Sequence, residues 1–568
     1  MRQNRSAPSA LSPEVHLVAR GTMVNIVAMV AGAVLSFGMT VLVSRWLQPK
    51  NAGALFELIA LFTIVSITLQ LGSDVGLTRW ISRARAIGGL AKVRRIVAIA
   101  LIPVLVAGTL ASAVIWVAAP TVAHTFLHGM NPAVAVADVR VIAPLVPLGS
   151  LSFCILAAAR GYGQMWPYLA IEGLGKPALR MGLVLVALII GLGLQGALIA
   201  WSAPIVLGLV AACLILVRYI RRESPGAGHR LSPPRTAGTA RHLSAHQEGA
   251  RHRLADPVRR PSPPRRHRDP APRAAKHGQR LAADFWRFAA PRGFAGTFQI
   301  AVIWLDILLV GAMLSRYAAG VYGAVSKLAV VGTFALEGTR LAIAPQMSAL
   351  LARKERARAA DLYQSATRWL MMASWPVYVL FIIFPAVVLG IFGHRYTAGA
   401  ASLAVLSAAM LVNLGTGNVT VVLLMGGKSS WNVVNTLGAL VINVGLNLVL
   451  LPRIGILGSA IAWAVSIVFD NMAAVIEAWL VLHLRPFGPG YGLVVVATAG
   501  CFGTAALAAR ALLGETLPAL VIAAALGAAA FALVAYLARA RLQLAGLIAA
   551  LLPGRPVVPA GEPGRQPT

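Results

Sequence analysis

Charged residues are scarce in this 568-residue chain: Asp, Glu, Lys and Arg make up 12% of it, whereas 58% of the residues are hydrophobic. Soluble domains average about 25% charged and about 45–50% apolar residues. So few charges cannot cover so much apolar surface in water, which excludes a soluble globular protein. Because one bilayer span takes about 20 apolar residues, the composition predicts a polytopic membrane protein.

Acidic residues are the scarcest of the charged ones, since 18 Asp and Glu stand against 50 Lys and Arg for a net charge of +32. In a membrane protein such an excess is typical of cytoplasmic loops, which collect Lys and Arg. We therefore expect no nucleic-acid partner, because no aromatic residues alternate with the basic ones and no binding module is visible.

Cysteine is also rare, and Cys154, Cys213 and Cys501 each stand alone within an apolar run. This spacing excludes a CxxC redox or zinc motif, so we interpret all three as packing residues. The chain has no HExxH motif and no nucleophile elbow, and Val422 replaces the first glycine that a phosphate-binding loop would need before Lys428. We expect no enzyme activity, no ATPase module and no cofactor.

Fourteen apolar runs are long enough to cross a bilayer. They cover residues 22–44, 54–72, 96–119, 140–160, 165–191, 197–219, 288–313, 320–344, 369–392, 398–425, 431–451, 456–482, 491–513 and 516–538. The first run lacks a signal-peptide cleavage site, so we expect a retained span. When residues 1–21 are placed in the cytoplasm, Lys and Arg collect in every second connection, which predicts that the tail 541–568 is cytoplasmic too.

The segment 221–284 differs from its surroundings, with 15 Lys and Arg, six histidines and many prolines. Such a composition buries too little apolar surface to offset chain entropy, which predicts a disordered cytoplasmic linker. Two roles stay open: a solvated connection between two halves, or a polybasic arm held to anionic lipid head groups.

The two halves share an internal repeat. Ser44-Arg45-Trp46 recurs 271 positions later as Ser315-Arg316-Tyr317, and the stretch 193–201 recurs 262 positions later as 455–463. We predict an all-α protein with two parallel six-helix lobes, residues 22–220 and 285–485, followed by two extra helices in 486–540. Two lobes around a central site are typical of alternating-access transporters.

The order of these motifs resembles the polysaccharide-repeat flippases of O-antigen and capsule synthesis, within the multidrug/oligosaccharidyl-lipid/polysaccharide exporter superfamily. The residues that carry the resemblance are Arg45, Trp46, Leu47, Gln48, Pro49, Gly53, Phe56, Gly72, Gly76, Arg79, Asp306, Gly311, Gly320, Tyr322, Gly323, Pro345, Gly427, Lys428, Asn443, Asn447, Pro452, Gly455 and Gly458. Gln48 departs from the usual Leu-Gly-Pro pattern, and the basic linker is longer than in the family; both leave the substrate open.

The resemblance implies a bacterial inner-membrane flippase that moves a polyprenyl-diphosphate-linked oligosaccharide from the cytoplasmic to the outer leaflet for cell-surface polysaccharide synthesis. Its partners would be this lipid-linked substrate, membrane lipids, and the polymerase and glycosyltransferases of the same pathway. Two alternatives stay open: a cation-coupled multidrug or metabolite exporter of the same superfamily, and a flippase for the peptidoglycan lipid precursor. The charge of the cavity wall discriminates between anionic and cationic substrates.

Ionisable residues inside spans usually face a cavity or a partner, because burying them in lipid costs at least about 2.5–3.5 kcal/mol. Glu172, Lys176 and Arg180 share one face of the fifth run at i, i+4 and i+8. Lys176 and Arg180 are candidates for binding a substrate diphosphate. The alternative is a local Glu172–Lys176 ion pair.

Three further positions are candidates. Glu57 and Lys327 lie four residues past equivalent glycines of the two repeats, so they could meet across the cavity, or each could reach the interface alone. Asp306 in the seventh run could carry a coupling proton or pair with a neighbour. Asp470 in the twelfth run is a weaker cavity or cation-site candidate.

Overall fold

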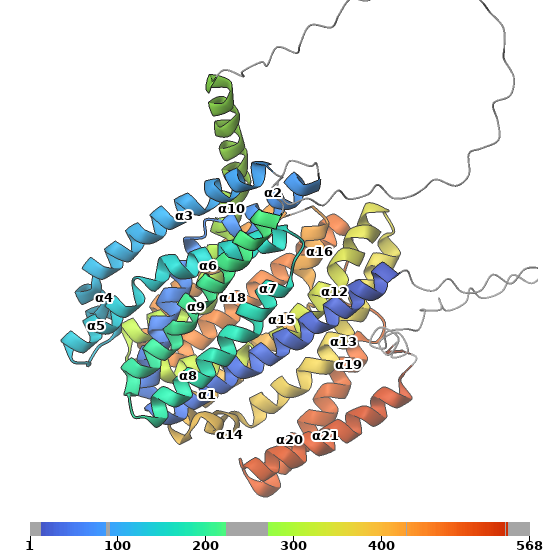
Figure 1. Ribbon diagram of the computed structural model, residues 1–568. Helices are drawn as coiled ribbons and strands as arrows, with labels where there is room; N and C mark the ends of the chain where they lie inside the picture. The colour runs from blue at the N-terminus through green and yellow to red at the C-terminus, as the bar shows by residue number, and fades with distance from the viewer. Residues whose placement is uncertain (1–12, 87–90, 223–270, 428, 540, 543–568) are drawn as a thin grey trace, which may run out of the picture.

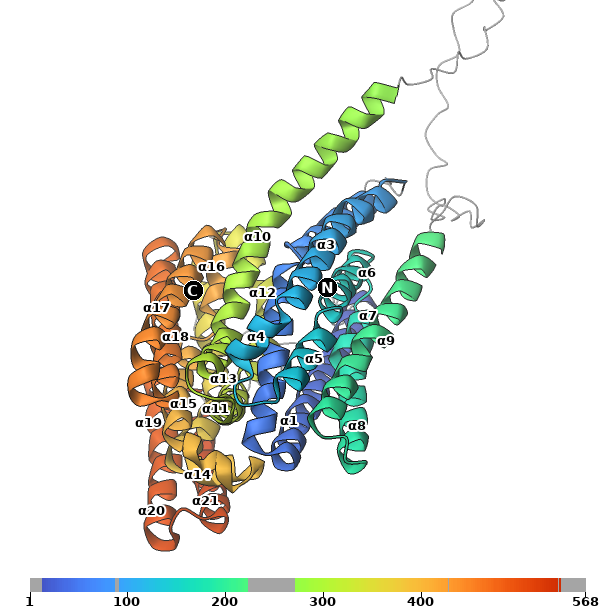
Figure 2. The same cartoon turned by 90° about the vertical axis from the view of Figure 1, so that its left-hand side faces the viewer.

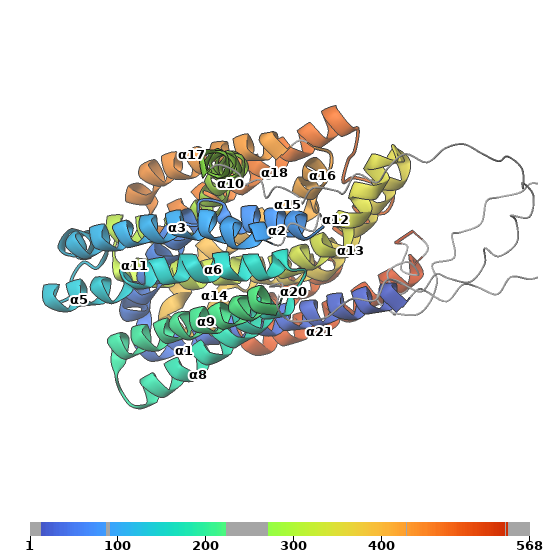
Figure 3. The ribbon, with the colours of Figure 1, turned by 45° about the horizontal axis from the view of Figure 1, so that its top comes forward.

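The chain folds into a bundle of long helices. The computed structural model describes residues 13–86, 91–222, 271–427, 429–539 and 541–542. Within these ranges every regular element is a helix and no strand occurs. Figure 3 shows the long helices running side by side in one general direction, as spans of a single bilayer do. The predicted all-α, multi-pass membrane protein is confirmed.

The N-terminal lobe contains the helices α1 to α9 (Figure 1). Their bounds are α1 Pro13–Thr68, α2 Ser73–Ala86, α3 Ala91–Val117, α4 Ala119–Phe126, α5 Pro132–Ile142, α6 Leu145–Gly161, α7 Trp166–Tyr168, α8 Lys176–Ile189 and α9 Gly193–Arg222, with a π-helical turn Leu169–Gly175 before α8.

The C-terminal lobe and the two extra spans contain α10 to α21. Their bounds are α10 Ala271–Met313, α11 Arg316–Ala329, α12 Thr333–Ala352, α13 Arg356–Ile383, α14 Pro385–Leu389, α15 Ala400–Gly415, α16 Val419–Met425, α17 Ser429–Ile454, α18 Ile456–Glu477, α19 Tyr491–Thr498, α20 Thr504–Leu513 and α21 Leu517–Leu537. Short 3₁₀ turns (Gly390–Phe392, His394–Gly399) and π-helical turns (Ala478–Leu482, Ala499–Gly503) join some of them.

The number of spans differs from the prediction. In the described residues, eleven helices are long and apolar enough to cross a membrane, or twelve when the bent pair of α11 and α12 counts as one span. The predicted fourteen are therefore not confirmed. Part of the difference has a local cause: α1 contains the first two apolar runs, joined at Gln48, whose φ of 60° breaks the helix. The fifth run is interrupted by the π-helical turn before α8.

The basic linker is shorter than predicted. Helix α10 begins at Ala271 and extends beyond the body of the bundle (Figure 2), so residues 271–284, which we expected to be disordered, are helical. Phe285 is 1% exposed, lies against Gly76 and belongs to the same buried cluster as Leu77 and Ile81. Leu281, one turn earlier, packs against this cluster. Once this anchored part of the helix has formed, adding further residues costs little free energy, because the unfavourable step in helix formation is nucleation. Residues 223–270 lie outside the described part.

The two lobes lie side by side, with α1, α10 and α11 between them (Figure 2). The largest buried apolar cluster contains residues of both lobes, among them Leu55 and Phe56 of α1 and Val321 and Val325 of α11. Helices α19, α20 and α21 lie outside the C-terminal lobe. The junction between α1 and α11 therefore positions everything near the centre of the molecule.

Candidate functional site

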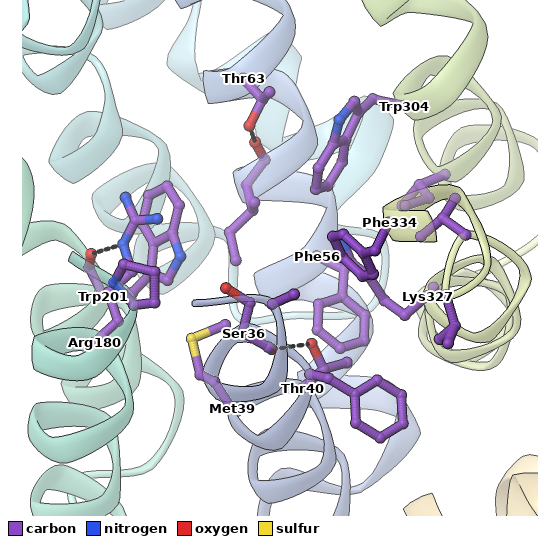
Figure 4. Close-up of a pocket in the computed structure, with 18 residues that line it drawn as sticks. Ser36, Met39, Thr40, Phe56, Thr63, Arg180, Trp201, Trp304, Lys327 and Phe334 are labelled. Atoms are coloured by element: carbon purple, nitrogen blue, oxygen red, sulfur yellow. Dashed lines mark hydrogen bonds between the residues drawn. The ribbon is translucent and has the colours of Figure 1, made fainter. Parts of the chain in front are cut away.

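A cavity of about 270 Å³ lies between the two lobes (Figure 4). The two legs of α1 form its floor and centre, α8 and α9 one wall, and α10, α11 and the start of α12 the other. Its lining residues are Ala33, Ser36, Phe37, Met39, Thr40, Phe56, Ile59, Thr63, Pro177, Arg180, Trp201, Trp304, Ile307, Gly323, Lys327, Val330, Val331 and Phe334. Two of these are charged, both are cations, and each comes from a different lobe.

Arg180 contributes the cation of the N-terminal lobe. Its Nε donates a hydrogen bond of 3.2 Å to the carbonyl oxygen of Trp201, and its guanidinium carbon lies 4.3 Å from the centre of the Trp201 ring. Arginine stacked on an aromatic face keeps its charge while one side of the guanidinium is shielded from water. No ion pair joins Arg180 to a carboxylate in the part of the chain that the structure describes.

Lys327 contributes the cation of the C-terminal lobe. Its Nζ lies 4.0 Å from the centre of the Trp304 ring, a cation–π contact, and the side chain is half-buried. Figure 4 shows Lys327 and Trp304 on the side of the cavity opposite Arg180 and Trp201. Each lobe thus presents one cation together with one tryptophan, an arrangement that can bind an anion and stack a flat ring face at the same time.

A second cavity, of about 190 Å³, shares Thr63, Arg180 and Trp201 with the first. Lys176 lines it but is 4% exposed, forms an ion pair with Glu172, and donates a 3.1 Å hydrogen bond to Ser152 Oγ. The local pair that was the alternative interpretation is therefore present. Of the two predicted cations on this face, Arg180 is the one that lines the inter-lobe cavity.

The face that carries Glu172, Lys176 and Arg180 is positioned by the packing of its backbone. The fifth run continues from the π-helical turn into α8 without a gap, which brings Glu172 and Lys176 within contact although Pro177 follows. Gly32 of α1 lies so close to Gly173 that a Cβ at Gly32 would be 1.7 Å from its carbonyl oxygen. A π-helical turn of this kind often occurs at functional sites.

Glu57 does not line either cavity. It is 1% exposed, its carboxylate lies against Gly311 of α10, and neither oxygen has a hydrogen-bond partner. A Glu57–Lys327 ion pair is not formed in this conformation, since one residue along a helix is a rotation of about 100°: Phe56 faces the cavity and Glu57 turns away from it.

Asp306 is also turned away from the cavity. Its oxygens accept hydrogen bonds of 2.9 Å from the hydroxyl of Tyr322 and 2.9 Å from Nδ2 of Asn447. The carboxylate is 1% exposed and joins α10, α11 and α17. In this conformation it has the neighbours of a structural group, a tyrosine and an asparagine.

Asp470 lies on α18 and lines neither of these two cavities, and its Oδ1 has no hydrogen-bond partner. Its neighbour Asn471 accepts a 2.7 Å hydrogen bond from Thr416, and Glu477 accepts one of 2.9 Å from Asn435. In the described residues no group of three His, Cys, Asp or Glu side chains could hold a metal ion.

Sequence patterns did not single out the two tryptophans of the site. Trp201 and Trp304 were counted as parts of apolar runs, yet each is the aromatic partner of a cavity cation. A tryptophan within a span is an amphipathic side chain whose flat face binds cations. That property makes the two tryptophans recognisable as candidates in the sequence, but only packing brings Trp201 of α9 to Arg180 of α8.

No protein-family model and no curated protein matches this chain. Among solved structures, the chain is similar to the lipid II flippase MurJ in an inward closed conformation, with a TM-score of 0.62 at 7% identity over 91% of this chain and 99% of that one. It is also similar to an inward-facing multidrug resistance MATE family transporter of the MOP superfamily, with a TM-score of 0.59 at 14% identity over 80% and 94% of the two chains. These similarities show the fold, which the chain shares with both of these structures. They do not confirm the polysaccharide-repeat subfamily.

Proposed function

We propose that the protein is a flippase of the bacterial inner membrane, which moves a polyprenyl-diphosphate-linked oligosaccharide to the outer leaflet by alternating access. The observation that carries the proposal is the inter-lobe cavity, whose two charged lining residues are both cations, Arg180 and Lys327. Two cations facing each other suit the adjacent negative charges of a diphosphate, which arginine binds through its planar fork of donors.

The size of the cavity supports a head-group site. Its 270 Å³ is slightly below the roughly 300–1,000 Å³ of sites that enclose a drug-sized ligand. We assign to it the diphosphate and the adjoining sugar ring, which would stack on Trp201 or Trp304, while the lipid chain stays in the bilayer. The protein would then be a transporter rather than an enzyme, working with the membrane lipids and the enzymes that build and polymerise its substrate.

The two alternatives differ in what supports them. The MATE likeness agrees with a multidrug exporter, but a cationic drug would meet two positive charges and no carboxylate in this cavity. The MurJ likeness agrees with a flippase for the peptidoglycan precursor, which is also a lipid diphosphate. The cavity therefore favours an anionic lipid over a cation, and the nature of the sugar decides between the two flippases.

The first test is made in a deletion strain. Loss of the gene should raise the amount of diphosphate-linked oligosaccharide on the cytoplasmic leaflet, and a plasmid copy of the wild type should reverse this. The double variant Arg180→Ala/Lys327→Ala should fail to reverse it, because both diphosphate ligands are removed. Quantitative lipid extraction and mass spectrometry measure the difference.

Arg140→Ala is the matched control, because Arg140 is an exposed arginine on α5 whose guanidinium lies over Trp116 of the same lobe. This variant should complement like the wild type. Sensitivity to cationic drugs without lipid accumulation would overturn the proposal in favour of efflux. Accumulation of the peptidoglycan precursor instead would support the cationic site as the diphosphate site and would change the proposed sugar.

A further inference from the structure

The two lobes are in close contact at the end that the distribution of basic residues predicts to face outward. Gly53 of α1 and Gly320 of α11 pack backbone against backbone. A Cβ at Gly53 would lie 1.9 Å from the carbonyl oxygen of Arg316, and a Cβ at Gly320 would lie 2.0 Å from that of Pro49. The cavity residues of α1 lie on its two legs, at 33–40 and 56–63. This contact therefore separates the cavity from the outer side.

Arg45 and Arg316, which are equivalent residues of the internal repeat, cross this contact in opposite directions. Arg45 of the N-terminal lobe donates through Nε to the carbonyl oxygen of Ile391 in the C-terminal lobe, at 2.7 Å. Arg316 of the C-terminal lobe donates through Nε to the carbonyl oxygen of His128 in the N-terminal lobe, also at 2.7 Å. Within this pair each lobe gives one arginine and receives one. A further arginine of the C-terminal lobe, Arg395, donates to Oε1 of Gln48 and lies outside the pair.

The two hydrogen bonds are related by the internal repeat. Arg45 and Arg316 are equivalent residues of the repeat, 271 positions apart. Their acceptors are 263 positions apart, and each lies two residues past the short helix that follows the third span of its lobe: His128 after α4, which ends at Phe126, and Ile391 after α14, which ends at Leu389. One such bond could be incidental, but the same donor atom on the same acceptor position in both halves indicates a pair related by the pseudo-twofold axis.

We propose that Arg45 and Arg316 are the twofold-related latch that closes the outer side of the cavity. The inference rests on the alternating-access part of the proposed function and not on the substrate. Because an axis relates the two bonds, a rotation of one lobe against the other lengthens both together. The outer side therefore opens only when both bonds break.

The donor and acceptor groups of these two hydrogen bonds suit a latch that forms and breaks. Both acceptors are backbone carbonyl groups that follow a short helix, His128 two residues after α4 and Ile391 in the 3₁₀ turn Gly390–Phe392 after α14. Accepting a side chain from the other lobe therefore breaks no α-helical hydrogen bond. A guanidinium donor makes the bond stronger than a neutral one. Because the acceptors are backbone atoms, substitution of His128 or Ile391 keeps them, and only the arginines can be tested by mutation.

The two halves of the latch are not equally strong. Arg316 is 7% exposed, whereas Arg45 is exposed. Breaking the Arg316 bond separates a buried cation from its acceptor, which costs more free energy than breaking the bond of a cation in contact with water. Loss of Arg316 should therefore open the outer side more than loss of Arg45.

The test measures access to the cavity from outside. Thr40, which lines the cavity, is replaced by Cys in a chain without Cys213 and Cys501, and intact cells are treated with a membrane-impermeant maleimide. We expect labelling to rise at least about tenfold in Arg45→Gln/Arg316→Gln, to rise less in Arg316→Gln and least in Arg45→Gln, since each charged hydrogen bond contributes about that factor or more. The matched control Arg140→Gln removes an exposed arginine of the same end that does not reach the other lobe, and its labelling should stay at the parent rate.

Native Cys154 reports unfolding, because it is 0% exposed and stays unlabelled in a folded chain. If Cys154 becomes labelled in the double variant, that variant has unfolded and the test depends on the two single variants. Thr40→Cys should then be labelled faster in Arg316→Gln than in Arg45→Gln. Equal Thr40→Cys labelling in the arginine variants and in Arg140→Gln would overturn the latch. The readout needs no substrate, so a wrong substrate assignment would leave this result unchanged, and a failed latch would leave the cationic site untouched.

Discussion

At the residue scale, the charges inside the spans fall into two groups that the sequence does not separate. Arg180 and Lys327 line the inter-lobe cavity, where each keeps a tryptophan partner and forms no ion pair in the described residues. Lys176 and Asp306 are satisfied by close neighbours instead. Burial of a polar group is tolerated when its hydrogen bonds are made, so the second group has a sufficient structural reason to exist.

This distinction gives a prediction for Asp306. Asp306→Ala removes the acceptor of the Tyr322 hydroxyl and of one N–H of the Asn447 amide. Each buried donor left without an acceptor lowers the unfolding free energy by roughly 1–3 kcal/mol. Asp306→Asn keeps one acceptor oxygen and should lose less. Thermal unfolding in detergent measures both variants.

Transport by Asp306→Asn is the complementary measurement. We expect it to complement the deletion strain, because the variant removes a charge and retains the contact to one partner. A variant that melts like the wild type but no longer complements would instead identify Asp306 as a group that carries a coupling ion.

At the scale of the elements, the approach of two helices depends on glycine. Helices α1 and α11 cross at Gly53 and Gly320 with their backbones in contact, and small residues of this kind let helices pack closely in a membrane. The obstacle that a side chain would meet there is main chain, which cannot rotate aside. Both glycines are among the residues that carry the family resemblance in the sequence, and the structure shows that they face each other.

A substitution at this crossing has a definite expected cost. Gly53→Ala should force α1 and α11 apart and lower the unfolding free energy by roughly 1–3 kcal/mol, as overpacking does. Gly182→Ala on α8 is the matched control, because no atom lies within 4 Å of a Cβ there. Since alanine is a better helix former than glycine by about 1 kcal/mol, the control should melt at the same or a higher temperature. Equal losses in both variants would contradict the close contact.

At the scale of the whole molecule, a shared core holds the two lobes together. The largest buried cluster includes apolar side chains from α1 of one lobe and from α11 and α15 of the other. Cross-lobe hydrogen bonds add to it at the outer end, among them Tyr396 Oη to the carbonyl oxygen of Ser44, at 3.2 Å. These contacts do not involve residues 223–270, so the covalent connection should not be needed for assembly.

Expression of the two halves as separate chains tests this. Residues 1–222 and 271–568, made in the same cell with a tag on one half, should co-purify from detergent and melt as one unit. Membranes that contain only one half each, mixed after solubilisation, form the control and should give little complex. Failure of the co-expressed halves to associate would show that the connection holds the lobes together.

Composition and pattern were enough to determine the class of the molecule. Too few charges for 58% hydrophobic residues imply a membrane protein, because only lipid can cover such a surface. The repeat implied two equivalent lobes, because a duplicated sequence folds in the same way twice. The sequence also identified Arg180 and Lys327, since a cation inside a span needs a cavity or a partner.

Only the tertiary structure decided which of these possibilities each residue takes. Position along the chain cannot tell that Glu57 turns towards α10 while Phe56 faces the cavity, or that Lys176 is already paired. Nor can it bring Arg45 to Ile391 and Arg316 to His128, because their distances along the chain are 346 and 188 residues. Patterns along a chain report what kind of surroundings a side chain requires, and packing between distant helices determines which atoms provide them.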